Sequence, residues 1–105
     1  MGSSKRLAAH YDTRPRHREV LSSARSGPLQ SLTEREVALR EQPLTIYPQP
    51  YRRVRAWVRF GPRAIRVDAK LARSTPHAVG IEFRAEVQVF RCWVWGNAVE
   101  FVDDE

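Results

Sequence analysis

The chain has 105 residues, of which 42% are hydrophobic and 29% charged, and its formal net charge is +6. This length supports one domain with one modest core. No apolar run approaches the ~20 residues that a membrane helix needs, and the N-terminus has no apolar stretch of signal-peptide length. The single cysteine, Cys92, cannot form an internal disulfide. We therefore expect a cytoplasmic protein in a reducing compartment.

The positive charge is concentrated in one segment. Residues 51–73 contain eight basic side chains and one acidic side chain, whereas residues 74–105 contain two basic and six acidic ones. A strongly basic segment is the electrostatic footprint of a protein that binds polyanions. The alternative is a solvated basic face that the acidic C-terminal tail balances.

Residues 1–50 are predicted to form a basic N-terminal arm with two short helices and a proline-rich linker. The first helix is expected to begin at a cap on Asp12 or Thr13 and to stop at Gly27, which precedes a proline. Thr33 and Glu36 have the spacing of a capping box for the second helix. That helix is expected to end at the first of three prolines in residues 43–51, which predict an extended linker. Both helices are too short to be stable alone, so each must dock on the rest of the chain or remain partly disordered.

Residues 51–105 are predicted to form a small β domain. Apolar and polar side chains alternate with period two, and this pattern predicts strands over residues 53–60, 64–72, 78–84, 87–95 and 99–102. The alternation is unbroken in the second of these strands, which makes it the clearest structural signal in the chain. Gly61 and Pro62 are expected to make a short turn between the first two strands.

The strand predicted over residues 87–95 has two competing registers, because Val87 and Val89 are out of phase with the apolar residues that follow. A β-bulge after Val89 would turn both sets inward and leave Trp93 and Trp95 facing outward, beside Trp57. If the first register continues, Trp93 and Trp95 lie in the core instead. Indoles are mostly buried, so the core is the expected place for any single tryptophan, although a domain this small cannot easily bury all three.

Four meandering strands, a tight corner and a short fifth strand over about 50 residues resemble a small SH3-like barrel. The short first hairpin turn resembles the ribosomal and chromatin-reader branches of that fold more than the peptide-binding branch. The predicted fold class is therefore mainly β, and α+β overall, with a five-stranded SH3-like barrel preceded by one or two short helices. The alternative is an open antiparallel sheet covered by the N-terminal helices. Neither architecture specifies a function.

Residues suited to catalysis or metal binding are scarce. The chain has no glycine-rich phosphate loop, and His10, His17 and His77 share no metal-ligand spacing with Cys92 or with one another. Cys92 is most simply a small buried apolar residue, although a pair with His77 stays open. We therefore predict no catalytic residue, no metal site and no cofactor, and we do not expect an enzyme.

The functional prediction rests on the stretch RRVRAWVRF, Arg52–Phe60. Its even positions form an ordinary core face, whereas its odd positions place Trp57 among three arginines on the outward side. Arginine neutralises phosphates and tryptophan stacks on exposed bases, a combination typical of proteins that bind single-stranded nucleic acid. The predicted nucleic-acid-binding residues are Arg53, Arg55, Trp57, Arg59, Arg66, Lys70, Arg91 and Trp93.

Two further features belong to this hypothesis. Asp68 is the only acid in the basic segment, and its place on an alternating strand predicts a cross-strand ion pair. Arg14, Arg16 and Arg18 could extend the basic surface as a flexible arm.

The alternative function is a protein-interaction module or accessory subunit without nucleic-acid contact. Exposed tryptophan and arginine are also enriched at interface hot spots, and two weak helices beside a small barrel suit a subunit that is fully ordered only on its partner. The expected partner is therefore single-stranded DNA, RNA or a nucleoprotein, or else an unidentified protein. No membrane is expected.

Overall fold

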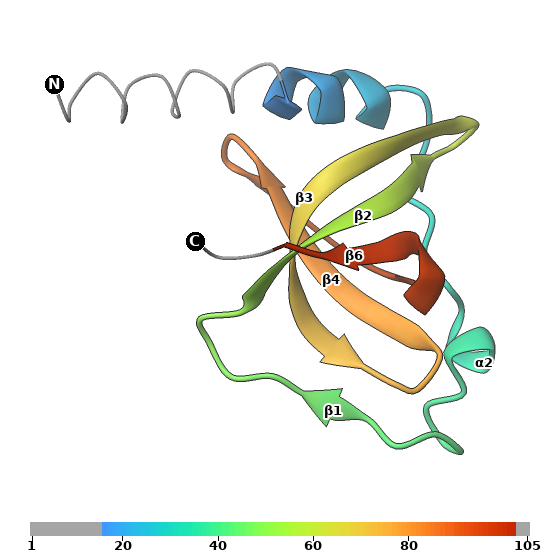
Figure 1. Ribbon diagram of the computed structural model, residues 1–105. Coiled ribbons are helices and arrows are strands. Elements are labelled where there is room, and N and C mark those ends of the chain that lie inside the picture. The colour runs from blue at the N-terminus through green and yellow to red at the C-terminus, as the bar shows by residue number, and fades with distance from the viewer. Residues whose placement is uncertain (1–15, 103–105) are drawn as a thin grey trace, which may run out of the picture.

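A computed structural model describes residues 16–102 of the chain, and its centre is one antiparallel sheet of six strands (Figure 1). The strands are β1 (Thr45–Ile46), β2 (Arg52–Phe60), β3 (Arg63–Ser74), β4 (Ala78–Ala85), β5 (Gln88–Trp95) and β6 (Val99–Phe101). The helical parts are residues 16–24, the short helix α2 (Glu34–Val37) and the 3-10 turn η1 (Gly96–Ala98). No helix within residues 16–102 has the length and apolar character needed to cross a membrane.

The strands are hydrogen-bonded in the order β5-β4-β3-β2-β6, and β1 pairs with the end of β3. β2 to β5 form a meander, and β6 returns to pair with β2. Within the described residues no pairing joins β5 to β6, so the sheet is open. The protein is therefore mainly β, as predicted, but the pairing corresponds to the alternative architecture, an open sheet, rather than to a closed five-stranded barrel.

β2 and β3 form a long hairpin because apolar and polar residues alternate along both strands. The apolar residues of both strands share one buried face: Val54, Ala56, Val58 and Phe60 on β2, and Ile65, Val67, Ala69 and Leu71 on β3. The turn between them requires glycine at Gly61, where φ is +57°. A Cβ atom there would also lie 2.7 Å from the carbonyl oxygen of Ser26. The predicted hairpin and its turn are both confirmed.

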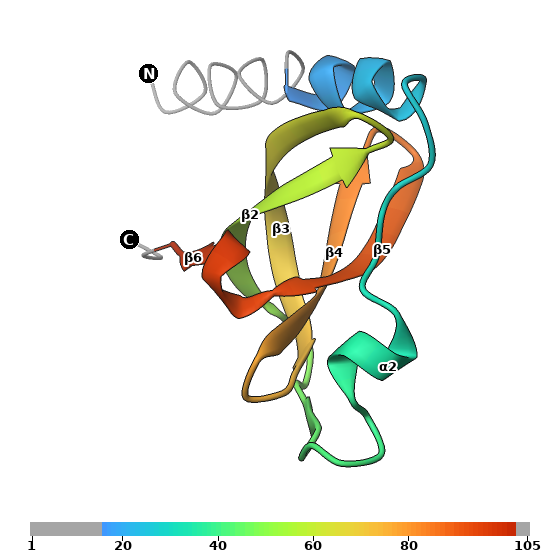
Figure 2. The ribbon, with the colours of Figure 1, turned by 90° about the vertical axis from the view of Figure 1, so that its right-hand side faces the viewer.

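The buried face of the sheet shares one core with the helix over residues 16–24. This helix lies across the ends of the β2–β3 and β4–β5 hairpins (Figures 1 and 2). Val20 on this helix belongs to the same cluster of buried side chains as the strand residues. At the centre of the core, the rings of Phe60 and Phe83 meet edge to face at 6.3 Å, and those of Phe83 and Phe90 stack at 5.1 Å. The first predicted helix is confirmed over residues 16–24, and its expected beginning lies outside the described residues.

Residues 28–32 connect two strands that are not neighbours in the sheet. The amide of Gln30 donates a hydrogen bond to the carbonyl of Arg59 on β2, at 2.8 Å. Two residues later, the amide of Leu32 donates to the carbonyl of Trp93 on β5, at 3.0 Å. The segment therefore satisfies backbone groups of both strands on the open side of the sheet, where direct pairing is absent from the described residues.

The second predicted helix is shorter than expected. Its capping box is confirmed: Thr33 Oγ1 accepts a hydrogen bond from the amide of Glu36, and Glu36 Oε1 accepts one from the amide of Thr33. The helix ends at Val37, however, because Ala38 adopts a left-handed conformation with φ of 57°. The predicted end at Pro43 was therefore wrong.

The segment predicted as a linker, residues 43–51, contributes the strand that the sequence pattern missed. Thr45 and Ile46 pair with the last two residues of β3 to form β1. The pairing of β2 with β3 ends at Arg52, but β3 continues to Ser74. β1 pairs with this last part of β3, on the same edge of β3 as β2. An extended proline-rich segment can fill such a gap with only two paired residues. The sheet has six strands rather than five for this reason.

β5 pairs continuously with β4 along its length, so the bulge that one alternative placed after Val89 is absent. The second of the two registers holds, with Cys92 and Val94 pointing into the core. Val87 is 97% exposed in the turn before β5, and Val89 also lies outward, so the apolar pair that suggested another register is simply on the surface. The register shift of the sheet lies instead in the pairing between β3 and β4.

Candidate nucleic-acid interface

The outward side chains of β2 and β3 form a basic surface with one indole in it. We define the Arg/Trp face as the exposed side chains Arg53, Arg55, Trp57, Arg59, Arg66 and Lys70. The hairpin register places Arg53 opposite Lys70, and Trp57 opposite Arg66. The prediction that the odd positions of β2 face outward is confirmed. The structure therefore brings six of the eight predicted site residues together on two adjacent strands.

Trp57 is the aromatic member of this face, and its side chain is 54% exposed. Arg55 and Arg59 flank it on the same side of β2, and Arg66 stands across the hairpin. Arg59 Nη1 donates a hydrogen bond to the carbonyl of Pro62 in the adjoining turn, at 3.2 Å. A flat apolar ring is thus held on a paired strand between cationic side chains.

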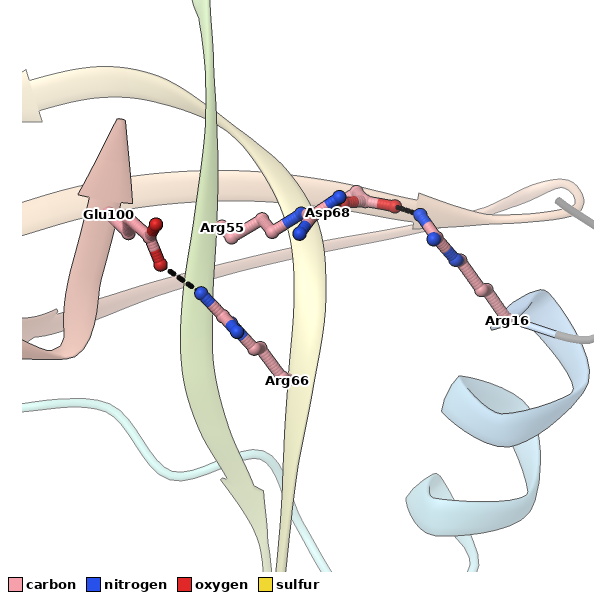
Figure 3. A network of polar contacts seen from close by, with 5 residues as sticks. All are labelled: Arg16, Arg55, Arg66, Asp68 and Glu100. Carbon is pink, nitrogen blue, oxygen red and sulfur yellow. Dashed lines mark hydrogen bonds and ion pairs between the residues drawn. The ribbon is translucent and has the colours of Figure 1, made fainter. Parts of the chain in front are cut away.

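Asp68 lies within this face and connects three parts of the chain (Figure 3). Its carboxylate accepts a hydrogen bond from Arg55 Nε across the hairpin, at 3.3 Å, which confirms the predicted cross-strand pair. It also pairs with Arg16 from the helix over residues 16–24, a contact that the sequence did not predict. Arg16 and Arg18 therefore belong to a helix rather than to a flexible arm, and Arg14 lies outside the described residues.

A second acid reaches the face from β6. Glu100 stands opposite Arg55 in the β2–β6 pairing, and its carboxylate pairs with Arg66 on β3, across β2 (Figure 3). The side chains of both pairs, Arg55–Asp68 and Arg66–Glu100, are well exposed to solvent. Such exposed pairs stabilise a protein by only ~0–1 kcal/mol each, so an incoming anion can exchange with the carboxylates at small cost.

A cleft with a volume of ≈ 340 Å³ extends the face toward the helix over residues 16–24. It exists because β3 and β4 pair only from Lys70 onward, so the other ends of these strands separate. The arginines that line the cleft include Arg16, Arg53, Arg55, Arg66 and Arg84. The helix is fixed on the β4 side as well, since His17 Nδ1 accepts a hydrogen bond from the amide of Glu86 at 3.3 Å. Guanidinium groups from four elements therefore converge on one concavity, which suits phosphate groups.

The two remaining predicted residues, Arg91 and Trp93, lie on β5. Arg91 pairs with Glu82 on β4, with an N–O distance of 2.9 Å, and Trp93 is partly buried. Trp95 is 43% exposed and leads directly into η1, which contacts β2, the strand of Trp57. All three tryptophans lie within the described residues and none is buried, so the expectation of a core indole was wrong. The reason is that phenylalanines and smaller apolar side chains already fill the core.

Within residues 16–102, few groups are suited to other chemistry. Cys92 is only 6% exposed, and burial raises the pKa of its thiol to about 11, so the thiol is protonated and unreactive at neutral pH. His77 is exposed in the turn between β3 and β4, and His10 lies outside the described residues. In the described part of the chain, no three His, Cys, Asp or Glu side chains are grouped so as to hold a metal ion.

Comparison with known proteins adds nothing to this picture. The chain finds no match among protein families, curated proteins or solved structures. A function can therefore be argued only from the side chains of this surface.

Proposed function

We propose that this protein is a small, non-catalytic module that binds single-stranded nucleic acid through the Arg/Trp face. The observation that carries the proposal is the half-exposed indole of Trp57 on a paired strand, surrounded by Arg55, Arg59 and Arg66. A base that stacks on an aromatic side chain contributes ~1–3 kcal/mol to binding. The neighbouring guanidinium groups would contact the phosphates on either side of that base.

The charge of the sheet supports a polyanionic ligand. Residues 52–101 contain ten basic and four acidic side chains. Asp68 and Glu100 neutralise part of this charge at the face, but through exposed ion pairs that a phosphate can replace. The arginine-lined cleft beside the helix would receive further phosphates of the same strand. Neither stacking nor phosphate contacts read base identity, so the expected binding tolerates many sequences.

The proposal also concerns fold and location. A four-stranded meander, a 3-10 turn and a short last strand that returns to the first strand of the meander support the view that the open sheet is a variant of the SH3-like barrel. A single cysteine, free and buried, supports a reducing compartment, and we place the protein in the cytoplasm.

A protein partner is the second candidate, and one observation favours it. Ile46 on the two-residue edge strand β1 is 68% exposed, and Leu44 beside it is also exposed. An edge strand with apolar side chains can pair with a strand of another protein. This surface does not involve Trp57 or its arginines, so the two candidates can be tested separately.

The test is a fluorescence anisotropy titration with labelled single-stranded DNA, single-stranded RNA and duplex DNA at two salt concentrations. We expect the single strands to bind and to quench tryptophan fluorescence. Four phosphate contacts would give a slope of about −3 in log K against log salt, since each contact on a single strand contributes about −0.7. Absence of binding to all three ligands at low salt would refute the proposal. The control variant Ile46→Ala should bind nucleic acid like the wild type.

A further inference from the structure

A groove lined by aromatic residues lies on the outward side of β3, β4 and β5, and Trp57 does not line it. Its volume is ≈ 500 Å³, which is in the range of small-ligand sites. Tyr51 and Trp93, both partly exposed, line it together with Gln49 and Arg73. The groove is therefore not a purely apolar surface but combines two aromatic rings with an amide and a cation.

The geometry of the groove depends on Gly80. The register of three adjacent strands places Arg73 on β3, Gly80 on β4 and Trp93 on β5 in one row. A Cβ atom on Gly80 would lie 3.4 Å from the Cβ of Arg73 and 3.5 Å from two atoms of the six-membered ring of Trp93. Because Gly80 has no side chain, the indole of Trp93 lies directly against β4 at this buried position, with Arg73 beside it.

The backbone of Trp93 is held on both sides. It is paired with Gly80 of β4, its amide donates a hydrogen bond to Ser31 Oγ at 2.9 Å, and its carbonyl accepts one from the amide of Leu32 at 3.0 Å. These contacts fix the backbone from which the indole of Trp93 projects. Glu82, the acid that lines the groove, is paired with Arg91, which leaves Arg73 to attract an anion.

We infer that this groove binds one nucleotide of the same strand that stacks on Trp57, an inference that rests on the proposed function. The base would lie against Trp93 and Tyr51, and its phosphate would contact Arg73. The amide of Gln49 offers both a donor and an acceptor to the edge of the base. A nucleotide fits better than a proline-rich peptide, because it uses the cation beside the aromatic rings as well as the rings themselves.

The test is photochemical cross-linking of the full-length protein to single-stranded oligonucleotides that carry 5-iodouracil, followed by peptide mapping with mass spectrometry. We expect adducts on Trp57 and, separately, on Trp93 or Tyr51. A valine at Gly80 would push the ring of Trp93 out of its place, so Gly80→Val should abolish the second adduct and weaken binding at least about fivefold, the lower limit for one stacked base.

A second variant keeps the test decisive if Gly80→Val does not fold. Arg73 is exposed, so Arg73→Ala should fold, weaken binding about threefold and reduce the salt slope by about 0.7. Its matched control is Arg40→Ala, which removes an exposed arginine that follows α2 and should change little.

The outcomes separate this inference from the proposed function. Adducts on Trp57 alone, with Arg73→Ala binding like Arg40→Ala, would refute the nucleotide site in the groove but not the binding role proposed for the Arg/Trp face. Absence of any salt-dependent binding would overturn both. Binding of a proline-rich peptide in the groove, abolished by Gly80→Val, without nucleic-acid binding would also overturn both.

Discussion

Replacing Trp57 by alanine distinguishes a binding surface from a structural one. The side chain is 54% exposed, whereas Phe60 on the same strand is 1% exposed. A large aromatic side chain buries 150–250 Å² when fully enclosed, so Trp57 buries roughly 100 Å². At ~25 cal/mol per Å² its truncation costs at most ~2.5 kcal/mol of unfolding free energy. Phe60→Ala should cost ~3–5 kcal/mol, because it also leaves a cavity.

The effect of Trp57→Ala on binding should exceed its effect on the fold. Loss of one stacked base, ~1–3 kcal/mol, raises the Kd for single-stranded DNA about 5- to 150-fold. Urea denaturation followed by circular dichroism gives the first quantity, and anisotropy at fixed salt gives the second. Phe60→Ala serves as the control for a destabilised core. Two results would refute the reasoning: an unfolded Trp57→Ala variant, which would make Trp57 a core residue, or a folded one with unchanged Kd.

Three other changes test separate parts of the structure. Glu100→Gln removes the exposed acid that pairs with Arg66, so it should tighten nucleic-acid binding two- to threefold and change the unfolding free energy by less than ~1 kcal/mol; unchanged or weaker binding would contradict the exchange of ion pairs. Cys92 should react with a thiol reagent at pH 8 only after denaturation, because with a pKa of about 11 only about 0.1% of the thiol is ionised. Because the folded pKa is the higher one, the contribution of this thiol to stability is complete below its ordinary pKa of 9.0 and is lost as pH rises toward 11. The difference in unfolding free energy between the wild type and Cys92→Ala should therefore be smaller at pH 10.5 than at pH 8. Gly61→Ala should lower stability by at least ~1–2 kcal/mol, from the left-handed backbone and the contact with Ser26, and a wild-type melting temperature would exclude both causes.

The hairpin of β2 and β3 was predictable because residues close together in the sequence specify it. Alternation with period two fixes which side chains face the core, and Gly61 marks the turn between the strands. The register of β5 was harder to predict. Val87 and Val89 look like core residues in the sequence, but one lies in a turn and the other on the surface. Apolar identity alone cannot distinguish these cases, because many apolar side chains remain exposed in folded proteins.

The site could be predicted only in part, for a related reason. The outward direction of Trp57 and its neighbours follows from strand periodicity. The Asp68 pair with Arg55 follows from the same periodicity, but two other contacts follow from long-range pairing: Glu100 reaches Arg66 because β6 returns to β2, and Arg16 meets Asp68 because the helix docks across the hairpin. No local pattern specifies such contacts. The groove at Trp93 was missed because the place of its indole depends on Gly80 on another strand.

The acidic partners change how the basic surface should be understood. An isolated exposed arginine samples many rotamers, and ordering it on a ligand costs conformational free energy. Arg55 and Arg66 are already held by Asp68 and Glu100, through pairs exposed enough to be replaced by phosphate. A nucleic acid would then meet guanidinium groups that are partly ordered, at the cost of competing with a carboxylate. The two effects oppose each other, so affinity should be moderate, and removal of an acid should raise it while leaving Trp57 as the residue whose loss lowers it most.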